Sequence, residues 1–290
     1  MTTFRSVGAC IFLMLLCVLA APAAISFTTV DVPGAAATEI LGINSAGDMV
    51  GAYYFTAYNW HGFKLSAGTF TYFDYPGAAS TIATDINDSG LIVGYYFTGI
   101  GVITHSFTYD GHTFTSFQHG ADPITLALGI NNAGQIVGAT ISAGYEYSFD
   151  LSNGKFALVG PKGYVSSFAN RVNNVGDIVG KVNYNGQAFI GYRYNNGKSS
   201  QIIYPGAVST EPYGINDSLI IVGGYRPAGP GEFGFAMRKG QYVAINYPGA
   251  STTVCSSINL AGQIVGSYVD SNGVNHGFVT TRIKAADFVH

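Results

Sequence analysis

Apolar and polar positions along the chain repeat in blocks. The first block, residues 42–54, reads GINSAGDMVGAYY: an apolar residue, an Asn with small or polar neighbours, then an apolar pair. Five near-copies begin at Asp85, Gly129, Arg171, Gly214 and Ser257. The Asn of the block recurs after 43, 44, 42, 43 and 43 residues. A period in this range indicates a repeat architecture.

The block predicts a tight hairpin between two short strands. Asn favours the first position of a type I turn, and Gly fits the fourth, where a left-handed backbone carries no Cβ penalty. The Asn stands six residues before the Val of the following strand in every copy, so the turn length is constant. In the fifth copy Leu219 replaces the Gly, and that hairpin is expected either to use another geometry or to bear strain.

Two further phrases divide each repeat. An aromatic or apolar strand ends at Tyr-Pro-Gly-Ala or a variant of it, and Pro-Gly breaks the strand. A hydroxyl residue then stands six positions before each Asn. Each repeat thus predicts four short antiparallel strands, which matches one blade of a β-propeller. The third strand of each carries the motifs His61-Gly62-Phe63, His105-Ser106-Phe107, Tyr147-Ser148-Phe149, Gln187-Ala188-Phe189, Phe233-Gly234-Phe235 and His276-Gly277-Phe278.

The phase of the repeats indicates how the chain is closed. Residues 25–32 form a lone fourth strand, and the chain ends with the first three strands of a repeat, from Ser257 to about Thr281. An open array would leave both pieces as exposed edges, whereas a ring joins them into one blade. We therefore predict an all-β, six-bladed β-propeller of four-stranded antiparallel blades, closed by the N-terminal strand joining the C-terminal blade. Linear solenoids fit less well, because capping repeats are absent.

The first 24 residues differ from the repeats. Arg5 precedes an apolar run over residues 7–19, and Ala21-Pro22-Ala23-Ala24 follows. This pattern is typical of a secretory signal peptide cleaved after Ala23 or Ala24. A transmembrane anchor is the alternative, but it needs about 20 apolar residues. We expect a signal peptide at residues 1–24, one domain at residues 25–290, a secreted or periplasmic bacterial protein, and no membrane anchor after cleavage.

Cysteine content follows from that cleavage. It removes Cys10 and Cys17 and leaves Cys255 alone, so the mature chain can form no internal disulfide. Cys255 lies in an apolar, strand-like run, where a small buried hydrophobe is favoured over a reactive thiol.

Composition limits the function classes. The chain is 48% apolar and 10% charged, against roughly 25% charged in a typical domain, so it offers a large core and few ionic groups for catalysis. A net charge of −3 gives no basic field for a nucleic acid. No nucleophile elbow, phosphate loop or metalloprotease helix is present, and we expect no cofactor and a monomer.

The His-x-Phe and GINxxGxIVG phrases resemble those of the extracellular HAF-repeat family of secreted bacterial proteins. The likeness covers nearly all of the chain beyond the signal segment, although His occupies the motif only at His61, His105 and His276. The resemblance implies a secreted repeat protein and assigns it no activity. Because those three His residues fall in separate repeats, we expect no zinc site.

The connections between the second and third strands are the predicted binding region. They vary in length while the Asn turns on the opposite face do not, and variable loops on a rigid scaffold usually carry binding. Their aromatic rings would suit sugar faces or a protein partner, although rings beside the apolar pair can instead pack between blades. The candidate ligand-binding residues there are Tyr54, Tyr58, Trp60, Tyr96 and Tyr145.

Two charges complete the candidate set. Asp85 and Arg171 stand just before the repeated Asn, where other copies have Gly or Ser. If the first strand is innermost, both lie near the central channel, where a charge is costly unless it is paired or hydrated. Asp85 and Arg171 are therefore either functional groups of the channel or members of a satisfied structural interaction, and the sequence leaves both interpretations open.

Three functions are consistent with these features. The first is a secreted binding or scaffolding module for glycan or cell-envelope material. The second is a secreted hydrolase or lyase with acids drawn from Glu39, Glu146, Glu211 and Glu232, which rests on fold analogy alone. The third is a structural surface or matrix protein without a discrete ligand.

Overall fold

The computed structural model describes residues 25–56, 59–99, 103–142, 144–184, 186 and 188–288. This part of the chain holds 24 strands and one 3-10 helix, η1 (Ala285–Phe288). Within it, no helix has the length and apolar character needed to cross a bilayer. The predicted all-β fold is confirmed, and the predicted signal peptide at residues 1–24 lies outside the described residues.

The strands group into six antiparallel units, in each of which the strands are called A to D in order of pairing. Unit 1 comprises β2 (Ala37–Ile43), β3 (Met49–Tyr54), β4 (His61–Ser66) and β5 (Thr69–Phe73). Unit 2 comprises β6 (Ser80–Ile86), β7 (Ile92–Phe97), β8 (Thr104–Tyr109) and β9 (Phe114–Phe117). Unit 3 comprises β10 (Ile124–Ile130), β11 (Ile136–Ser142), β12 (Tyr145–Ser152) and β13 (Lys155–Leu158).

The remaining units follow the same order, except that the last takes its strand D from the other end of the chain. Unit 4 comprises β14 (Ser166–Val172), β15 (Ile178–Asn183), β16 (Ile190–Asn195) and β17 (Lys198–Ile202). Unit 5 comprises β18 (Ser209–Ile215), β19 (Ile221–Arg226), β20 (Phe233–Arg238) and β21 (Gln241–Ile245). Unit 6 comprises β22 (Thr252–Ile258), β23 (Ile264–Val269), β24 (Asn275–Thr280) and β1 (Phe27–Val30).

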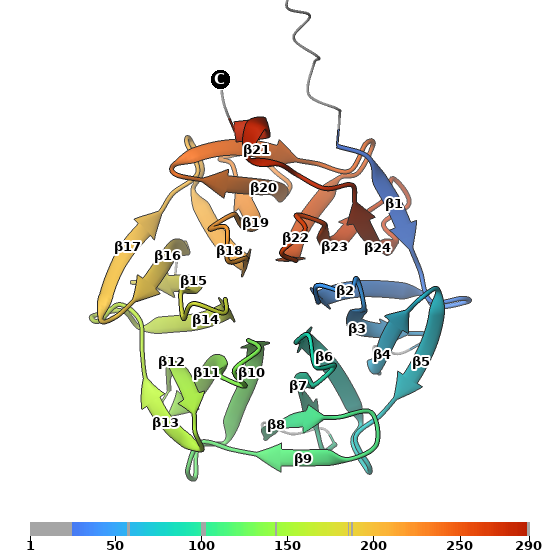
Figure 1. Cartoon of the computed structure of the whole chain (residues 1–290), viewed down its shortest axis with the longest axis vertical. Coiled ribbons are helices and arrows are strands. Elements are labelled where there is room, and N and C mark those ends of the chain that lie inside the picture. The colour runs from blue at the N-terminus through green and yellow to red at the C-terminus, as the bar shows by residue number, and fades with distance from the viewer. Residues whose placement is uncertain are drawn as a thin grey trace, which may run out of the picture.

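The units are arranged around a common centre, with strands A nearest to it and strands D at the outer edge (Figure 1). The N-terminal strand β1 lies antiparallel beside β24, in a register that pairs Phe27 with Thr280. The ring of Phe27 is half-buried there and meets the rings of Tyr247 and Phe278 edge-on, with centroids 5.3 and 5.5 Å apart. The first strand of the domain therefore packs on the last unit.

Each unit is centred on one aromatic ring of strand C. The ring faces the Gly of strand B: a Cβ on Gly51 would lie 3.0 Å from Phe63, so this Gly leaves room for it. In the fourth repeat the motif ending at Phe189 is predicted to lie on the third strand, and that prediction is wrong. Phe189 precedes β16, and Tyr192 pairs with Gly180 at this position. The six central rings, all fully buried, belong to Phe63, Phe107, Phe149, Tyr192, Phe235 and Phe278.

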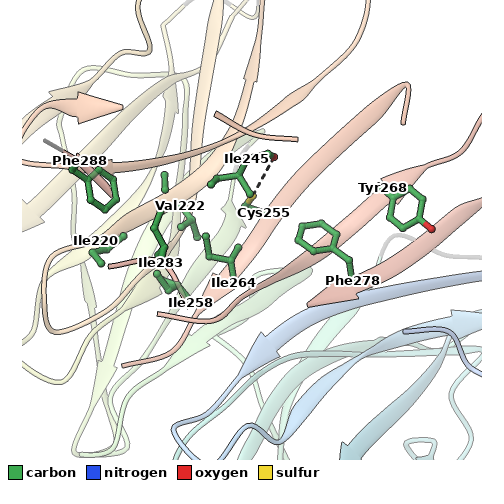
Figure 2. Packing of buried hydrophobic residues seen from close by; sticks show 11 residues of the cluster. Ile220, Val222, Ile245, Cys255, Ile258, Ile264, Tyr268, Phe278, Ile283 and Phe288 are labelled. Carbon is green, nitrogen blue, oxygen red and sulfur yellow. Dashed lines mark hydrogen bonds between the residues drawn. The ribbon is translucent and has the colours of Figure 1, made fainter. Parts of the chain in front are cut away.

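Apolar side chains fill the space between neighbouring units, and Figure 2 shows the cluster between units 5 and 6. Cys255 is fully buried in it, with Sγ 4.0 Å from the carbonyl oxygen of Ile245. Burial raises the pKa of the Cys255 thiol. The prediction of a small buried hydrophobe is confirmed. Ile283 and Phe288, from the C-terminal segment, complete the cluster.

The Asn turns between strands A and B share one geometry. The Gly90 N–H donates to the Asn87 carbonyl at 3.0 Å, and the Leu219 N–H donates to the Asn216 carbonyl at 3.0 Å. Leu219 keeps this turn by adopting a positive φ of 57°. Of the two expected alternatives, the hairpin of the fifth repeat therefore bears backbone strain and does not change its geometry. The Leu219 side chain packs against the cluster around Phe235, which offsets part of that cost.

The repeated hydroxyl ties consecutive units together. The Thr81 Oγ1 accepts a hydrogen bond of 2.9 Å from the Tyr75 N–H, at the point where the chain leaves strand D of one unit for strand A of the next. A buried hydroxyl at this position satisfies a backbone donor that no strand partner reaches. The same bond recurs from residue i to residue i+6 at Val32–Thr38, His119–Thr125, Tyr204–Thr210 and Tyr247–Thr253.

Candidate functional site

The repeated Asn residues form a cycle of hydrogen bonds around the centre. Each Oδ1 accepts from a backbone N–H of its own turn, as Asn44 does from Asp48 at 2.9 Å. Each Nδ2 donates to the carbonyl of the Asn in the next unit, and Asn259 donates back to Asn44 at 3.2 Å. The turn alone would accept Asn, Asp or Ser at the repeated position, because each has a side-chain oxygen that can accept a hydrogen bond. The cycle requires Asn, because its bonds need an amide donor. The other five bonds are Asn44–Asn87, Asn87–Asn131, Asn131–Asn173, Asn173–Asn216 and Asn216–Asn259, at 3.0 to 3.3 Å.

A β-bulge in every strand A shapes the neck of the central channel. In unit 1 the register shifts between Ile40 and Gly42, and the other five strands A shift at the same place. A Cβ on Gly129 would lie 2.9 Å from the Cα of Arg171, so the neck admits side chains only from alternate units. The six residues after the bulge are Gly42, Asp85, Gly129, Arg171, Gly214 and Ser257.

Arg171 and Asp85 close this neck. Both are buried, at 6% and 3% exposure, and Arg171 Nη1 lies 2.6 Å from Asp85 Oδ1. Asp85 Oδ2 accepts a further bond of 2.9 Å from the Ile130 N–H. A guanidinium has five N–H donors, and all five have acceptors here. Besides Asp85, the acceptors are the carbonyl oxygens of Leu41, Thr84, Tyr213 and Ser256, at 2.8 to 3.3 Å.

The pair therefore contacts all six units. Burial raises the pKa of Asp85, and the Arg171 guanidinium together with the Ile130 N–H opposes that rise. Because every donor of Arg171 is already engaged, the geometry favours a satisfied structural interaction over a free ligand-binding group. The ligand-binding role of Asp85 and Arg171 stays a prediction.

A cavity of about 400 Å³ lies on one side of the neck. It lies toward the connections between strands B and C, because its lining residues other than Arg171 stand at or before the bulge in strands A, or in the second half of strands B. Its walls are mainly apolar, with polar groups at a few points, which is typical of small-molecule sites. The lining residues are Glu39, Leu41, Thr84, Tyr95, Leu126, Leu128, Phe168, Asn170, Arg171, Lys181, Tyr213, Val254, Ser256 and Ser267. A smaller hollow of about 70 Å³ faces the Asn turns on the other side.

Lys181 stands at the edge of this cavity among three aromatic rings. Its Nζ lies 4.5 Å from the ring centroid of Phe189, 5.3 Å from that of Tyr213 and 5.4 Å from that of Phe168. All three distances are within the range of a cation–π contact. The same Nζ lies 2.7 Å from Glu211 Oε2, which also accepts from the Tyr213 hydroxyl at 2.7 Å. Burial acts to raise the pKa of Glu211, but Lys181 and these hydrogen bonds outweigh it and lower the pKa.

Glu39 is the carboxyl group that faces the cavity. Burial raises its pKa, opposed by a hydrogen bond of 2.7 Å that Asn275 Nδ2 donates to Oε1. Burial, with a smaller effect of the nearby Glu39, raises the pKa of Tyr95 to about 12. A carboxyl group whose neutral form is favoured in a cavity is a candidate proton donor.

The other acids predicted on this face are held by neighbours. Ser166 donates to the carboxylate of Glu146, and Arg226 Nη2 lies 3.1 Å from Glu232 Oε2. Glu211 is paired with Lys181, as described above. Of the four acids, only Glu39 lines the cavity.

The predicted aromatic site residues do not converge. Tyr54 and Trp60 are half-buried, and their rings meet edge-on with centroids 4.8 Å apart. Tyr145 is 49% exposed at the start of β12. Tyr58 lies outside the described residues. None of the described four aromatic candidates lines the cavity.

Tyr96 is the clearest case of packing between strands. It is 5% exposed and stacks on Tyr75, with centroids 3.6 Å apart and planes inclined by 6°. Its hydroxyl lies 3.0 Å from Ser116 Oγ. The ring is therefore engaged within the protein, and the ligand-binding role of Tyr96 stays a prediction.

Apart from Glu39 and Arg171, the residues that line the cavity could not be predicted from the sequence, because they lie on strands and not on the loops where binding residues were expected. Tyr95, Phe168, Lys181 and Tyr213 stand at channel-facing positions of strands A and B. The signal that could have found them is their position relative to the repeated Asn. The bulge hides that signal, because it shifts the alternation of inward and outward residues by one.

The motif His residues lie in separate units. His61 Nδ1 is 2.8 Å from Asp74, and His276 Nδ1 is 2.7 Å from Asp31. Among the residues that the structure describes, no group of three or more His, Cys, Asp or Glu side chains could hold a metal ion.

The sequence matches no protein-family model, and no curated protein sequence matches it. Solved structures resemble it in shape. TolB from Acinetobacter baumannii has a TM-score of 0.53 at 12% identity, over 84% of this chain and 63% of that one. An inactive variant of virginiamycin B lyase from Staphylococcus aureus, solved with quinupristin, has a TM-score of 0.50 at 11% identity, over 90% and 100%.

A lectin is also among the similar structures. A mutant of the Aleuria aurantia lectin in complex with Fucα1-6GlcNAc has a TM-score of 0.50 at 9% identity, over 83% of this chain and 91% of that one. At such low identity these likenesses show the fold alone. The chain has a β-propeller fold.

Proposed function

We propose that the chain forms a closed six-bladed β-propeller, exported from a bacterial cell after removal of residues 1–24. The pairing of β1 with β24 and the bond from Asn259 to Asn44 support closure. Closure matters for function because the cavity is lined by strands of every unit.

We further propose that the protein is a binding module whose ligand occupies the cavity of about 400 Å³. The observation that carries this proposal is the shape of the cavity: its walls are mainly apolar, and its floor is closed by the Arg171–Asp85 pair. A pocket with one open end and few polar groups holds a ligand in one orientation. Glycan or cell-envelope material is the proposed ligand, because Tyr95, Phe168 and Tyr213 offer ring faces beside amide and hydroxyl groups.

Filling the cavity tests this function. Leu126→Trp places a larger side chain in the cavity and is expected to abolish binding, because the ligand loses its space. The measurement is a glycan-binding screen of the purified protein, followed by calorimetry with the best ligand. Leu158→Trp is the matched control, since Leu158 is exposed on β13 outside the cavity. Equal binding by the Leu126 variant and the parent would place any ligand elsewhere.

A second candidate function is that of a hydrolase or lyase that acts on the bound ligand, and one observation favours it. Glu39 faces the cavity, and burial raises its pKa. A carboxylic acid in that state can donate a proton to a leaving group. Glu39→Gln keeps the shape and is expected to lower the turnover of any substrate found in hydrolase and lyase screens by about 100-fold or more. Glu232→Gln, outside the cavity lining, is the control. Unchanged turnover in the Glu39 variant would rule out this role.

A further inference from the structure

A second cavity lies where the chain crosses from unit 3 to unit 4. Its volume is about 220 Å³, and its lining includes Pro161, Tyr164, Val182, Tyr192 and Gln201. The repeat explains why this cavity exists. In three other units the corresponding place is filled by two tyrosine rings in a face-to-face stack.

The stacked pairs have nearly identical geometry. Tyr204 lies on Tyr225 at 3.7 Å and Tyr247 on Tyr268 at 3.6 Å, with planes inclined by 7° in both cases. The pair in unit 2, Tyr75 on Tyr96, has the same spacing. The first Tyr of each pair stands six residues before the repeated hydroxyl residue on strand A. The second Tyr lies on strand B, directly opposite that hydroxyl residue in the strand register.

Unit 4 has neither ring. Pro161 stands six residues before Ser167, and Val182 pairs with Ser167. Pro161 also lacks a backbone N–H, so it cannot donate the hydrogen bond that the repeated hydroxyl accepts in the other units. The Ser167 hydroxyl instead lies 2.6 Å from Ser148 Oγ, which is 3.0 Å from the Tyr192 hydroxyl. These buried hydroxyl groups satisfy one another, so the crossing is stable with the smaller side chains.

In two of the three units with a stacked pair, a hydroxyl residue on strand D bonds to the hydroxyl of one ring, whereas unit 5 has Ala244 at that position. In unit 2, the Tyr96 hydroxyl is 3.0 Å from Ser116, which pairs with the central ring of that unit. In unit 6, the Tyr268 hydroxyl is 2.9 Å from Thr29, which occupies the same position on strand D. The corresponding residue of unit 4 is Gln201, which lines the cavity. Its amide can donate to a phenolic oxygen or accept from its O–H.

We propose that this cavity is a binding site for a phenolic ring. The ring occupies the place that tyrosine fills in units 2, 5 and 6, and its hydroxyl bonds to Gln201. Apolar cavities of about 150 Å³ are known to bind benzene, so the space suffices for one substituted ring. The site is separate from the channel cavity and does not depend on the function proposed there.

The test uses p-cresol, the analogue of a tyrosine side chain, with the purified protein carrying isotope-labelled valine methyl groups. Intermolecular NOEs between p-cresol and the Val182 methyl groups are expected. Toluene, which lacks the hydroxyl, should bind about 2- to 10-fold more weakly, because it cannot form the hydrogen bond to Gln201, which is exposed to solvent in the free protein. N-acetyl-tyrosinamide distinguishes the source of the ring: contact by both compounds assigns the site to tyrosine of a polypeptide as well, and contact by p-cresol alone assigns it to small phenols.

Two variants decide the location of the site. Pro161→Tyr restores the ring of the other units, and it should remove the NOEs to Val182, while Val208→Tyr adds the same side chain at an exposed position and should leave them. Gln201→Ala keeps the space open and should erase the preference for p-cresol over toluene. Absence of contact between p-cresol and Val182 in the parent, or contact that persists in the Pro161 variant, would overturn the proposal.

Discussion

Replacing Arg171 with Met is expected to lower the free energy of unfolding by about 3–5 kcal/mol. The substitution leaves Asp85 buried without its counter-charge, and it removes the donors of four backbone carbonyl groups at the neck. Uncompensated buried charge and unsatisfied acceptors both destabilise the folded state. Urea unfolding followed by tryptophan fluorescence and circular dichroism measures the change.

Two further variants show that the loss comes from the pair. Arg282→Met removes an exposed arginine and should change the free energy of unfolding by less than about 0.5 kcal/mol. The double variant Asp85→Leu with Arg171→Met should be more stable than Arg171→Met alone, because no unpaired buried charge remains at the neck. A double variant as unstable as the sum of the single variants would show that the two residues act independently.

Removing the strand before Pro33 should abolish cooperative unfolding or cause aggregation. The deletion takes away β1, exposes the edge of β24, and removes the contacts of Phe27 with Tyr247 and Phe278. Burial of a Phe side chain stabilises by roughly 1.5–3 kcal/mol, and an exposed strand edge invites pairing between molecules. Calorimetry and size-exclusion chromatography of the truncated protein measure both effects.

A pair of cysteines tests the same closure without deletion. Thr28 and Val279 are partners in the register of β1 and β24, so Thr28→Cys with Val279→Cys should cross-link under mild oxidation. Thr28→Cys with Thr71→Cys is the control, because Thr71 lies on β5 of unit 1 and pairs with Lys64. If the truncated protein melts like the parent and only the control pair cross-links, the chain is an open array.

The four-strand unit could be predicted from the sequence because its hairpins are local. Asn, Gly and the apolar pair determine each A–B turn within a few residues. The third strand of unit 4 was harder to place, since Phe189 and Tyr192 are both aromatic and three residues apart. Pairing with Gly180 selects Tyr192, because only a residue opposite that Gly finds space for a large ring.

The candidate site was predicted in part. Asp85 and Arg171 could be assigned to the channel because charges replace small residues there. Their pairing could not be predicted, because they belong to units 2 and 4, which are not consecutive. The cavity depends on a bulge in strand A that no single residue type marks, and on how six strands face one another across the centre. Such contacts are absent from any local pattern.

The Asn cycle also bears on how the protein folds and how long it stays folded. Five of its bonds join residues 42 to 44 apart in the sequence, whereas the bond from Asn259 to Asn44 spans 215. Contacts between distant residues cost more chain entropy and form more slowly. The last bond should therefore form late in folding, after the individual units. Once it has formed, no unit can separate without breaking contacts on both of its sides, so unfolding should be slow and resistance to proteases long-lived.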